Sequence, residues 1–175
     1  GAGLTNLTIN STGSANIVDN LNLPATLTAA TINAATAFTA RNGIAAGFAA
    51  NSTLTINGAG AVALQTAALR ANINTVNAAA NTGGVTAILN GSQTITVTGG
   101  TGNERLTTGA VLTTGTVNAG AGTDDRLTVA VSAHITAAAG ARYLGFESLE
   151  VVNGVTVDAS QLAANNTLTA ARFTN

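Results

Sequence analysis

The chain has 175 residues, of which 46% are hydrophobic and 7% are charged, so it is long and apolar enough to form one folded domain. Its six cationic residues are all Arg and lie scattered from Arg41 to Arg172, which excludes a basic stripe that would follow nucleic acid. Without Cys there are no disulfides and no thiolate chemistry, and no apolar run approaches the roughly 18 residues of a membrane span. Because it begins at Gly1 rather than Met, we expect the chain to be part of a larger protein.

A short β-branched phrase recurs along the chain and closes with Asn or Gly. It reads LTIN, ATIN, LTIN, NTVN, TVTG, GTVN and EVVN. A strand phrase that returns about every twenty residues is typical of a parallel β-solenoid, in which each coil pairs with the coils before and after it. The last interval is longer and predicts one enlarged coil. The phrases end at Asn10, Asn33, Asn57, Asn77, Gly99, Asn118 and Asn153.

We therefore predict an all-β, right-handed parallel β-solenoid (β-helix) over 1–175, with at most one or two short helices. Asn at a strand end is expected to adopt left-handed backbone geometry and to ladder its amide onto the next Asn, while Ala and Gly fill a narrow interior. An antiparallel sandwich remains the alternative. Thr/Asn/Ala-rich coils are expected over 1–98, and coils with glycine-rich acidic turns over 99–175.

Three segments depart from the strand texture. Leu69, Ile73 and Val76 are spaced as on one helix face, which predicts a short helix within 63–76. The stretch DASQLA (158–163) is interpreted as a turn capped by Asp158. Segment 33–51 has no clear period and is interpreted as a loop leaving one coil.

Two acidic turns, NERLTTG (103–109) and DDRLTVA (124–130), repeat acid, Arg, Leu and Thr in the same order. If the offset between them is one coil, Glu104 stacks on Asp125 and Asn103 on Asp124. Stacked carboxylates destabilise each other unless a cation lies between them. Ca²⁺ suits such a turn because it takes six to eight oxygen ligands, and glycine lets backbone carbonyls point inward. The glycines concerned are Gly100, Gly102, Gly120 and Gly122.

These turns resemble the RTX nonapeptide, Gly-Gly-x-Gly-x-Asp-x-Leu-x. GGTGNERLT (99–107) matches it with Glu104 in place of Asp, and AGAGTDDRLT (119–128) matches it with one extra residue, so that Asp124 or Asp125 is the ligand. LGFESLEVVNG (144–154) and VDASQL (157–162) are similar to phrases of calcium-dependent, type I-secreted surface-layer (S-layer) proteins of Gram-negative bacteria. The specific motifs cover about 99–162; residues 1–98 share only composition and rhythm with this family.

The resemblance implies a secreted, non-enzymatic protein of the bacterial cell surface that binds Ca²⁺ and self-assembles into an extracellular lattice. Low charge and a regular Thr/Ala surface also favour close packing of copies. Cell-surface polysaccharide is a possible further partner, bound through regions outside this segment. The alternative in the same class is a stalk domain of a secreted RTX adhesin or biofilm matrix protein.

Each candidate residue also has a simpler interpretation that involves no function. Arg105 and Arg126 could neutralise the acidic turns as exposed ion pairs, although neighbouring strand residues face opposite sides. Glu147 is either a third calcium ligand or a strand-edge charge. His134, the one histidine, is expected on a solvent-facing loop, and no nucleophile motif precedes Ser132. The aromatic side chains are expected in the core or as plugs at coil ends: Phe38, Phe48, Tyr143, Phe146 and Phe173.

Two further function classes are considered. Parallel β-helices host polysaccharide lyases, but the cations here are too few and do not group near the acidic turns. Thr-x-Thr pairs at 26–28, 53–55, 94–98 and 167–169 suggest ice binding. Their spacing does not repeat once per coil, so no flat threonine array is expected.

Overall fold

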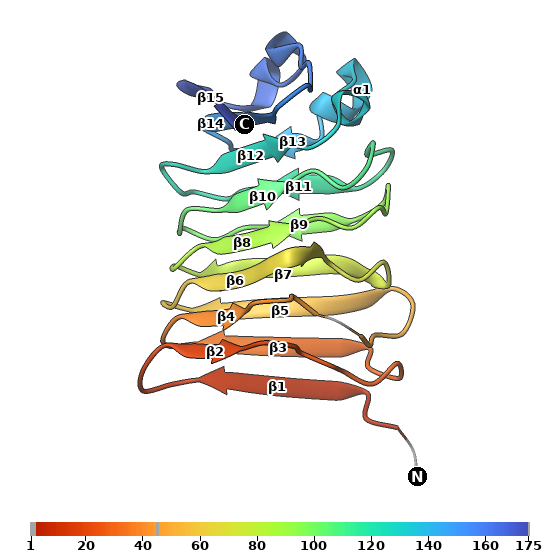
Figure 1. Cartoon of the computed structure of the whole chain (residues 1–175), viewed down its shortest axis with the longest axis vertical. Helices are drawn as coiled ribbons and strands as arrows, with labels where there is room; N and C mark the ends of the chain where they lie inside the picture. The colour runs from red at the N-terminus through yellow and green to blue at the C-terminus, as the bar shows by residue number, and fades with distance from the viewer. Residues whose placement is uncertain (1–2, 45, 175) are drawn as a thin grey trace.

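The computed structural model describes residues 3–44 and 46–174 and is a parallel β-solenoid of about eight turns (Figure 1). Consecutive strands alternate between two sheets, except that the last two strands pair with each other in the same sheet, and every strand pair is parallel. The seven-stranded sheet has the spatial order β1 (Asn6–Ser11), β3 (Ala29–Ala34), β5 (Ser52–Gly58), β7 (Ile73–Asn81), β9 (Thr96–Thr98), β11 (Thr116–Asn118) and β13 (Tyr143–Leu144).

The eight-stranded sheet faces it across a narrow interior. It runs from the C-terminal to the N-terminal end as β15 (Ala170–Thr174), β14 (Ser148–Val152), β12 (Arg126–Val129), β10 (Arg105–Thr107), β8 (Val85–Ile88), β6 (Val62–Ala68), β4 (Phe38–Ala40) and β2 (Asn16–Val18). The predicted all-β solenoid is confirmed, and the antiparallel sandwich is excluded.

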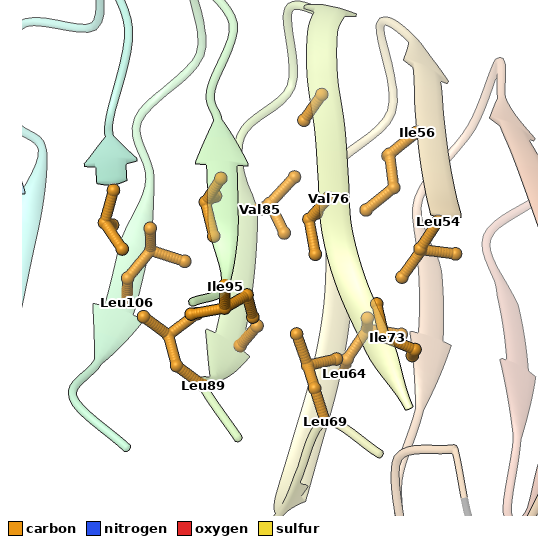
Figure 2. Packing of buried hydrophobic residues seen from close by; sticks show 14 of the residues in the cluster. Leu54, Ile56, Leu64, Leu69, Ile73, Val76, Val85, Leu89, Ile95 and Leu106 are labelled. Atoms are coloured by element: carbon orange, nitrogen blue, oxygen red, sulfur yellow. The ribbon is translucent and has the colours of Figure 1, made fainter. Parts of the chain in front are cut away.

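The core forms because alternate strand residues point between the sheets and align coil over coil. One inward column of the seven-stranded sheet contains Leu54, Val76, Val97 and Val117, all buried. Leu64 and Leu106 face them from the other sheet (Figure 2). The interior is therefore a ladder of aliphatic side chains rather than a globular cluster.

The asparagine ladder is confirmed for the first three coils. Asn33 Nδ2 donates to Asn10 Oδ1 at 2.9 Å, and Asn57 Nδ2 donates to Asn33 Oδ1 at 3.0 Å. The expected left-handed backbone is wrong for these residues, because Phe48 and Asn51 are the only non-glycine residues with positive φ in the described chain. The seventh strand phrase, EVVN, lies on β14 of the other sheet, so it does not continue this series.

The helix expected within 63–76 is wrong. This segment consists of most of β6, a connection over 69–72 and the start of β7, and Leu69, Ile73 and Val76 are all buried in the core. Leu69 N donates to the Ile88 carbonyl of the next coil at 2.8 Å, so pairing between coils replaces helical hydrogen bonds. The spacing of Leu69, Ile73 and Val76 fits one face of a helix, but strand pairing between neighbouring coils determines the structure of this segment.

Helical structure is confined to short turns. These are α1 (Ala137–Gly140) and the 3₁₀ turns η1 (Ser132–His134), η2 (Ala159–Gln161) and η3 (Ala163–Asn165). The predicted cap of η2 is confirmed, since Asp158 accepts from Ser160 N. Within 33–51, β4 interrupts the expected loop and residues 41–44 and 46–51 are irregular. Phe38, Phe48, Tyr143 and Phe146 are buried as expected, whereas Phe173 is 79% exposed.

Candidate functional site

The two acidic turns lie one coil apart at the corner where the chain passes from the seven-stranded to the eight-stranded sheet. Arg105 pairs in register with Arg126, which places Glu104 beside Asp125 as the sequence predicted. Arg126 pairs in turn with Ser148, so Glu147 is next in the same line. We call Glu104, Asp125 and Glu147 the acidic column.

The acidic column replaces an apolar one. In earlier coils the same register position is occupied by Phe38, Val62 and Val85, which are buried core residues. Glu104 is 1% exposed and Asp125 is fully buried, while Glu147 is half-buried. The carboxyl groups therefore enter the solenoid interior at the start of each strand, where side chains alternate inward.

Each acid of the column accepts a backbone N–H. Glu104 N donates to Asp125 Oδ1 at 2.6 Å, Asp125 N donates to Glu147 Oε2 at 2.8 Å, and Gly100 N donates to Glu104 Oε1 at 3.3 Å. The first two bonds connect successive coils and the third lies within one turn, and together they use one oxygen of each carboxyl group. Glu104 Oε2 and Asp125 Oδ2 are buried and have no hydrogen-bond partner.

The same corner carries donors instead of acids in earlier coils. Ser11 Oγ donates to the carbonyls of Thr36 and Ala37, and Asn81 Nδ2 donates to those of Gly58 and Gly60. Buried carbonyls of these turns are thus satisfied by neutral donor side chains. An ionised carboxylate cannot donate a hydrogen bond to a carbonyl oxygen. In the acidic coils, a proton or a bound cation must therefore satisfy the buried oxygens instead.

Glycine makes room for the Asp125 carboxyl group. A methyl group at Gly122 would lie 2.4 Å from both Asp125 Oδ1 and the Gly102 carbonyl oxygen, so these oxygens approach one space from adjacent turns. A methyl group at Gly102 would meet the Gly84 nitrogen at 2.1 Å, and one at Gly100 the Asn81 carbonyl at 1.8 Å. Gly120 has a φ of +105°. The predicted glycines therefore permit close stacking of the turns.

Burial dominates the titration of the acidic column. It raises the pKa of Glu104 to about 8, and the negative charge of Asp125 adds to this effect. Burial also raises the pKa of Asp125 to about 6, with further contributions from the charges of Glu147 and Asp124. Both shifts mean that two negative charges at this position are unfavourable unless they are compensated.

Asp124 has a different environment from Asp125. It lies on the outer side, where Arg105 Nη2 is 3.3 Å from Asp124 Oδ2 and Ser148 Oγ donates to Asp124 Oδ1. Asn103 Oδ1 accepts from the backbone N–H of Asp124, which places these two residues on adjacent coils as expected. Of the two aspartates left open by the motif, Asp125 is therefore the one aligned with Glu104.

The arginines neutralise other acids. Arg126 Nη1 pairs with Glu150 Oε2, and Arg105 pairs with Asp124, both on the outer face of the eight-stranded sheet. Neither contact reaches the buried acidic column. Among residues 3–44 and 46–174, no three carboxylate or imidazole side chains converge as a complete metal site. A cation at this corner would need backbone carbonyls and water in addition to the carboxyl groups.

His134 lies away from the acidic column. It belongs to η1, is half-buried, and its Nδ1 is 2.9 Å from Thr108 Oγ1, so it is not the solvent-facing loop residue expected. Thr108 is itself buried and accepts from Ala130 N. This contact fixes η1 against the preceding coil.

A second surface, which sequence spacing missed, is the outer face of the seven-stranded sheet. Thr53, Thr75, Thr96 and Thr116 form one column in register. A second column, two residues along each strand, contains Thr8, Thr31, Thr55, Asn77, Thr98 and Asn118. Threonine therefore recurs in register over several coils, which the spacing of the Thr-x-Thr pairs did not indicate. Thr-x-Thr pairs were the wrong signal, because single threonines from different phrases align only once the register is known.

No described helix is long and apolar enough to cross a membrane. Comparison with family models, with curated proteins and with solved structures finds no match for this chain.

Proposed function

We propose that this chain is a structural, non-enzymatic part of a secreted bacterial surface-layer protein, which binds Ca²⁺ and assembles with copies of itself outside the cell. The observation that supports this best is the acidic column, in which two buried carboxyl groups on adjacent coils each keep one oxygen without a partner. Such groups are strongly unfavourable in an apolar interior unless a proton or a cation compensates them.

The residues of this corner fit Ca²⁺. Glu104 Oε2 and Asp125 Oδ2 offer hard oxygen ligands, and the Gly102 carbonyl and the Asp125 carboxyl group border the same space beside Gly122. Gly100, Asn103, Gly120, Gly122 and Asp124 complete the two turns, and Glu147 follows one coil further along. Water would supply the remaining ligands, and extracellular calcium modules of this kind bind at about 10⁻⁴–10⁻³ M. Bound Ca²⁺ would join adjacent coils.

Calcium titration of thermal stability tests the proposal. Millimolar Ca²⁺ is expected to raise the melting temperature of the chain by several degrees, as linkage requires for a ligand near tenfold above its Kd. Glu104→Gln and Asp125→Asn should each abolish most of this rise. Asp19→Asn, an exposed acid far from the corner, is the matched control. An equal calcium response in Asp125→Asn and wild type would remove the acidic column from the proposal.

A stalk domain of an RTX adhesin or biofilm matrix protein is the alternative within the same class. The long parallel stack suits a spacer as well as a lattice subunit. A stalk requires tandem copies and a terminal binding module, whereas a lattice protein requires an anchoring domain. Sequencing the parent gene on both sides of this segment separates them.

The threonine columns favour ice binding as a second candidate function. Neighbouring strands lie about 4.7–4.9 Å apart and alternate residues about 6.6 Å apart, so the columns form a two-dimensional grid of hydroxyl and methyl groups, interrupted by the amides of Asn77 and Asn118. Threonine is stiff at χ1, and the strands of this sheet carry no charged residue. A rigid, uncharged surface with regularly aligned hydroxyl groups is the property of this sheet that favours the candidate.

Growth of ice crystals measures this candidate directly. The wild-type chain should slow ice recrystallisation, and Thr75→Arg, in the middle of the first column, should abolish the effect. Thr39→Arg carries the same change on the outer face of the eight-stranded sheet and should leave it intact. Recrystallisation rates equal to those in buffer would remove this candidate while leaving the calcium proposal unaffected.

A further inference from the structure

Thr108 is a polar residue in an otherwise apolar column of the core. The pairing of β10 with β8 and β12 places Thr108 between Leu89 and Val129 of the neighbouring coils. Leu89 is 2% exposed, Val129 is fully buried and Thr108 is 1% exposed. A hydroxyl group buried in such a place must find its hydrogen-bond partners inside the molecule.

The Thr108 hydroxyl group has two partners, and they fix the direction of its proton. Its oxygen accepts from Ala130 N at 3.1 Å, and His134 Nδ1 lies 2.9 Å from the same oxygen. Within 3–44 and 46–174, no other group bonds to this hydroxyl group. The backbone N–H can only donate, so the hydroxyl proton donates to His134 Nδ1. His134 is therefore a neutral ring that carries its hydrogen on Nε2.

The turn η1 joins three successive coils through two side chains. His134, its last residue, contacts Thr108 on the coil before. Ser132 Oγ, at its start, accepts from Thr156 N on the coil after at 2.9 Å. Ile135 follows η1 and is buried in the core. The bond between His134 and Thr108 thus holds η1 on the preceding coil.

No charge acts on this bond from the elements around η1. Their charged residues pair with one another, cap η2 or lie beside the other sheet, and no hydrogen bond or ion pair joins any of them to His134. They are Arg105, Asp124, Arg126, Glu150, Asp158 and Arg142. Burial lowers the pKa of His134 from its ordinary value. The neutral ring is therefore the form that the folded chain favours.

We propose that the bond between Thr108 and His134 is an acid-sensitive switch, which holds η1 on the preceding coil at neutral pH and releases it in acid. A proton from solvent adds to Nδ1, which then donates instead of accepting. The buried Thr108 hydroxyl proton thereby loses its acceptor, and two donors face each other. This switch goes beyond the proposed function and depends on neither calcium nor assembly.

The direction of the pH dependence follows from the two states of the ring. The bond is complete above the ordinary pKa of histidine, about 6.5, and is lost as the pH falls through the lowered pKa of the folded state. The acidic column acts in the opposite direction, because protonation of its carboxyl groups stabilises the fold at low pH. A loss of structure in acid at η1 therefore cannot come from the acidic column.

Hydrogen exchange of the segment 130–136 measures the release. Protection is expressed as the ratio of intrinsic to observed exchange rate, which removes the effect of pH on the exchange chemistry. We expect the protection of 130–136 to fall about five- to tenfold between pH 7.5 and pH 5, as for the loss of one hydrogen bond. Peptides from β5 and β7 should not lose protection. Constant protection of 130–136 over this range overturns the proposal.

Three variants separate the bond from simple burial of the ring. His134→Asn offers an amide oxygen near the position of Nδ1 and does not titrate, so 130–136 should stay protected at both pH values. Thr108→Ser keeps the hydroxyl group and should keep the wild-type response. Thr108→Val continues the apolar column and should abolish the response. A wild-type loss of protection in acid in His134→Asn or in Thr108→Val overturns the proposal.

Nuclear magnetic resonance of the ring tests the same bond without a substitution. His134 is the one histidine of the chain, so its ring signals are unambiguous. The nitrogen shifts at pH 7.5 should place the hydrogen on Nε2, and the ring should titrate at a lower pH than histidine in an unfolded peptide. A hydrogen on Nδ1 at neutral pH, or a titration like that of the peptide, overturns the proposal.

Discussion

At the scale of single residues, the main feature of this solenoid is that it buries two carboxyl groups in an otherwise apolar interior. A column that holds Phe38, Val62 and Val85 in earlier coils holds Glu104 and Asp125 in later ones, with no change in backbone register. The backbone accommodates either kind of side chain, but an apolar residue is satisfied by packing alone. A buried acid needs a partner for each oxygen, which makes its stability conditional on the solution.

The stability of the calcium-free chain is expected to depend on pH. The pKa of Glu104 is raised to about 8 and that of Asp125 to about 6, so both groups hold protons more tightly in the folded state than in the unfolded state. Their contribution is therefore complete below about pH 4, where both states are protonated, and is lost as the pH rises through 6 and then 8. Melting temperatures measured in EGTA from pH 4 to pH 9 should fall across this range.

A substitution that removes one ionisable group provides the control for this pH dependence. Glu104→Gln should flatten the upper part of the fall, because the amide does not ionise. A melting temperature that rises between pH 5 and pH 8 in EGTA would contradict the raised pKa values.

At the scale of elements, the coils fit together through turns rather than through long strands. β9, β10 and β11 are each three residues long, and the turns 99–104 and 119–125 between the sheets are longer than the corresponding turns 82–84 and 145–147. Glycine stacks on glycine at this corner, with Gly102 against Gly83 and Gly84 and Gly122 against Gly102. The turns thus approach at backbone contact distance, which no side chain permits.

Gly102→Ala is expected to destabilise the chain by about 1–3 kcal/mol, the usual cost of overpacking a rigid site. Its methyl group would lie 2.1 Å from the Gly84 nitrogen, and backbone cannot move aside as a flexible side chain can. Gly91→Ala is the control, because a methyl group there meets no atom within 4 Å. Chemical denaturation of the two variants measures the difference. Equal stability would mean that the stacked turns have room to separate.

At the scale of the whole molecule, the solenoid is quasi-one-dimensional. Each coil contacts mainly the coils before and after it, as β3 contacts β1 and β5. Stability is then close to a sum of coil and interface contributions, and the end coils have one interface instead of two. The middle coils, which contain Leu54, Ile56 and Ile73, combine full burial with neighbours on both sides.

Hydrogen exchange should therefore show a gradient along the stack. In dilute protein, amides of β1, β2 and β15 are expected to exchange fastest, and those of β5 to β8 slowest, because opening of an end breaks only one interface. Mass spectrometry of peptides after brief exchange resolves the strands. Uniform protection from end to end would indicate a single cooperative unit and contradict this description.

Sequence alone determined the solenoid, because repetition is a local property. Strand phrases closing at Asn10, Asn33 and Asn57 carry the period, and alternation of Thr with Leu or Ile fixes which side of each strand faces inward. The same repeat aligned Glu104 with Asp125, since the offset of the two acidic turns is one coil. These inferences needed only the spacing of residues along the chain.

Tertiary structure alone decided what depends on the register of all coils together. It turned the segment 63–76 into two strands and moved the phrase at Asn153 to the other sheet. It put Glu147, which the sequence left as either a ligand or a strand-edge charge, in line with Glu104 and Asp125. It also placed Asp124 outside the acidic column beside Arg105, and aligned single threonines into two columns. The physical reason is that a coil's length varies from turn to turn, so contacts between coils follow from backbone pairing and not from a fixed sequence period.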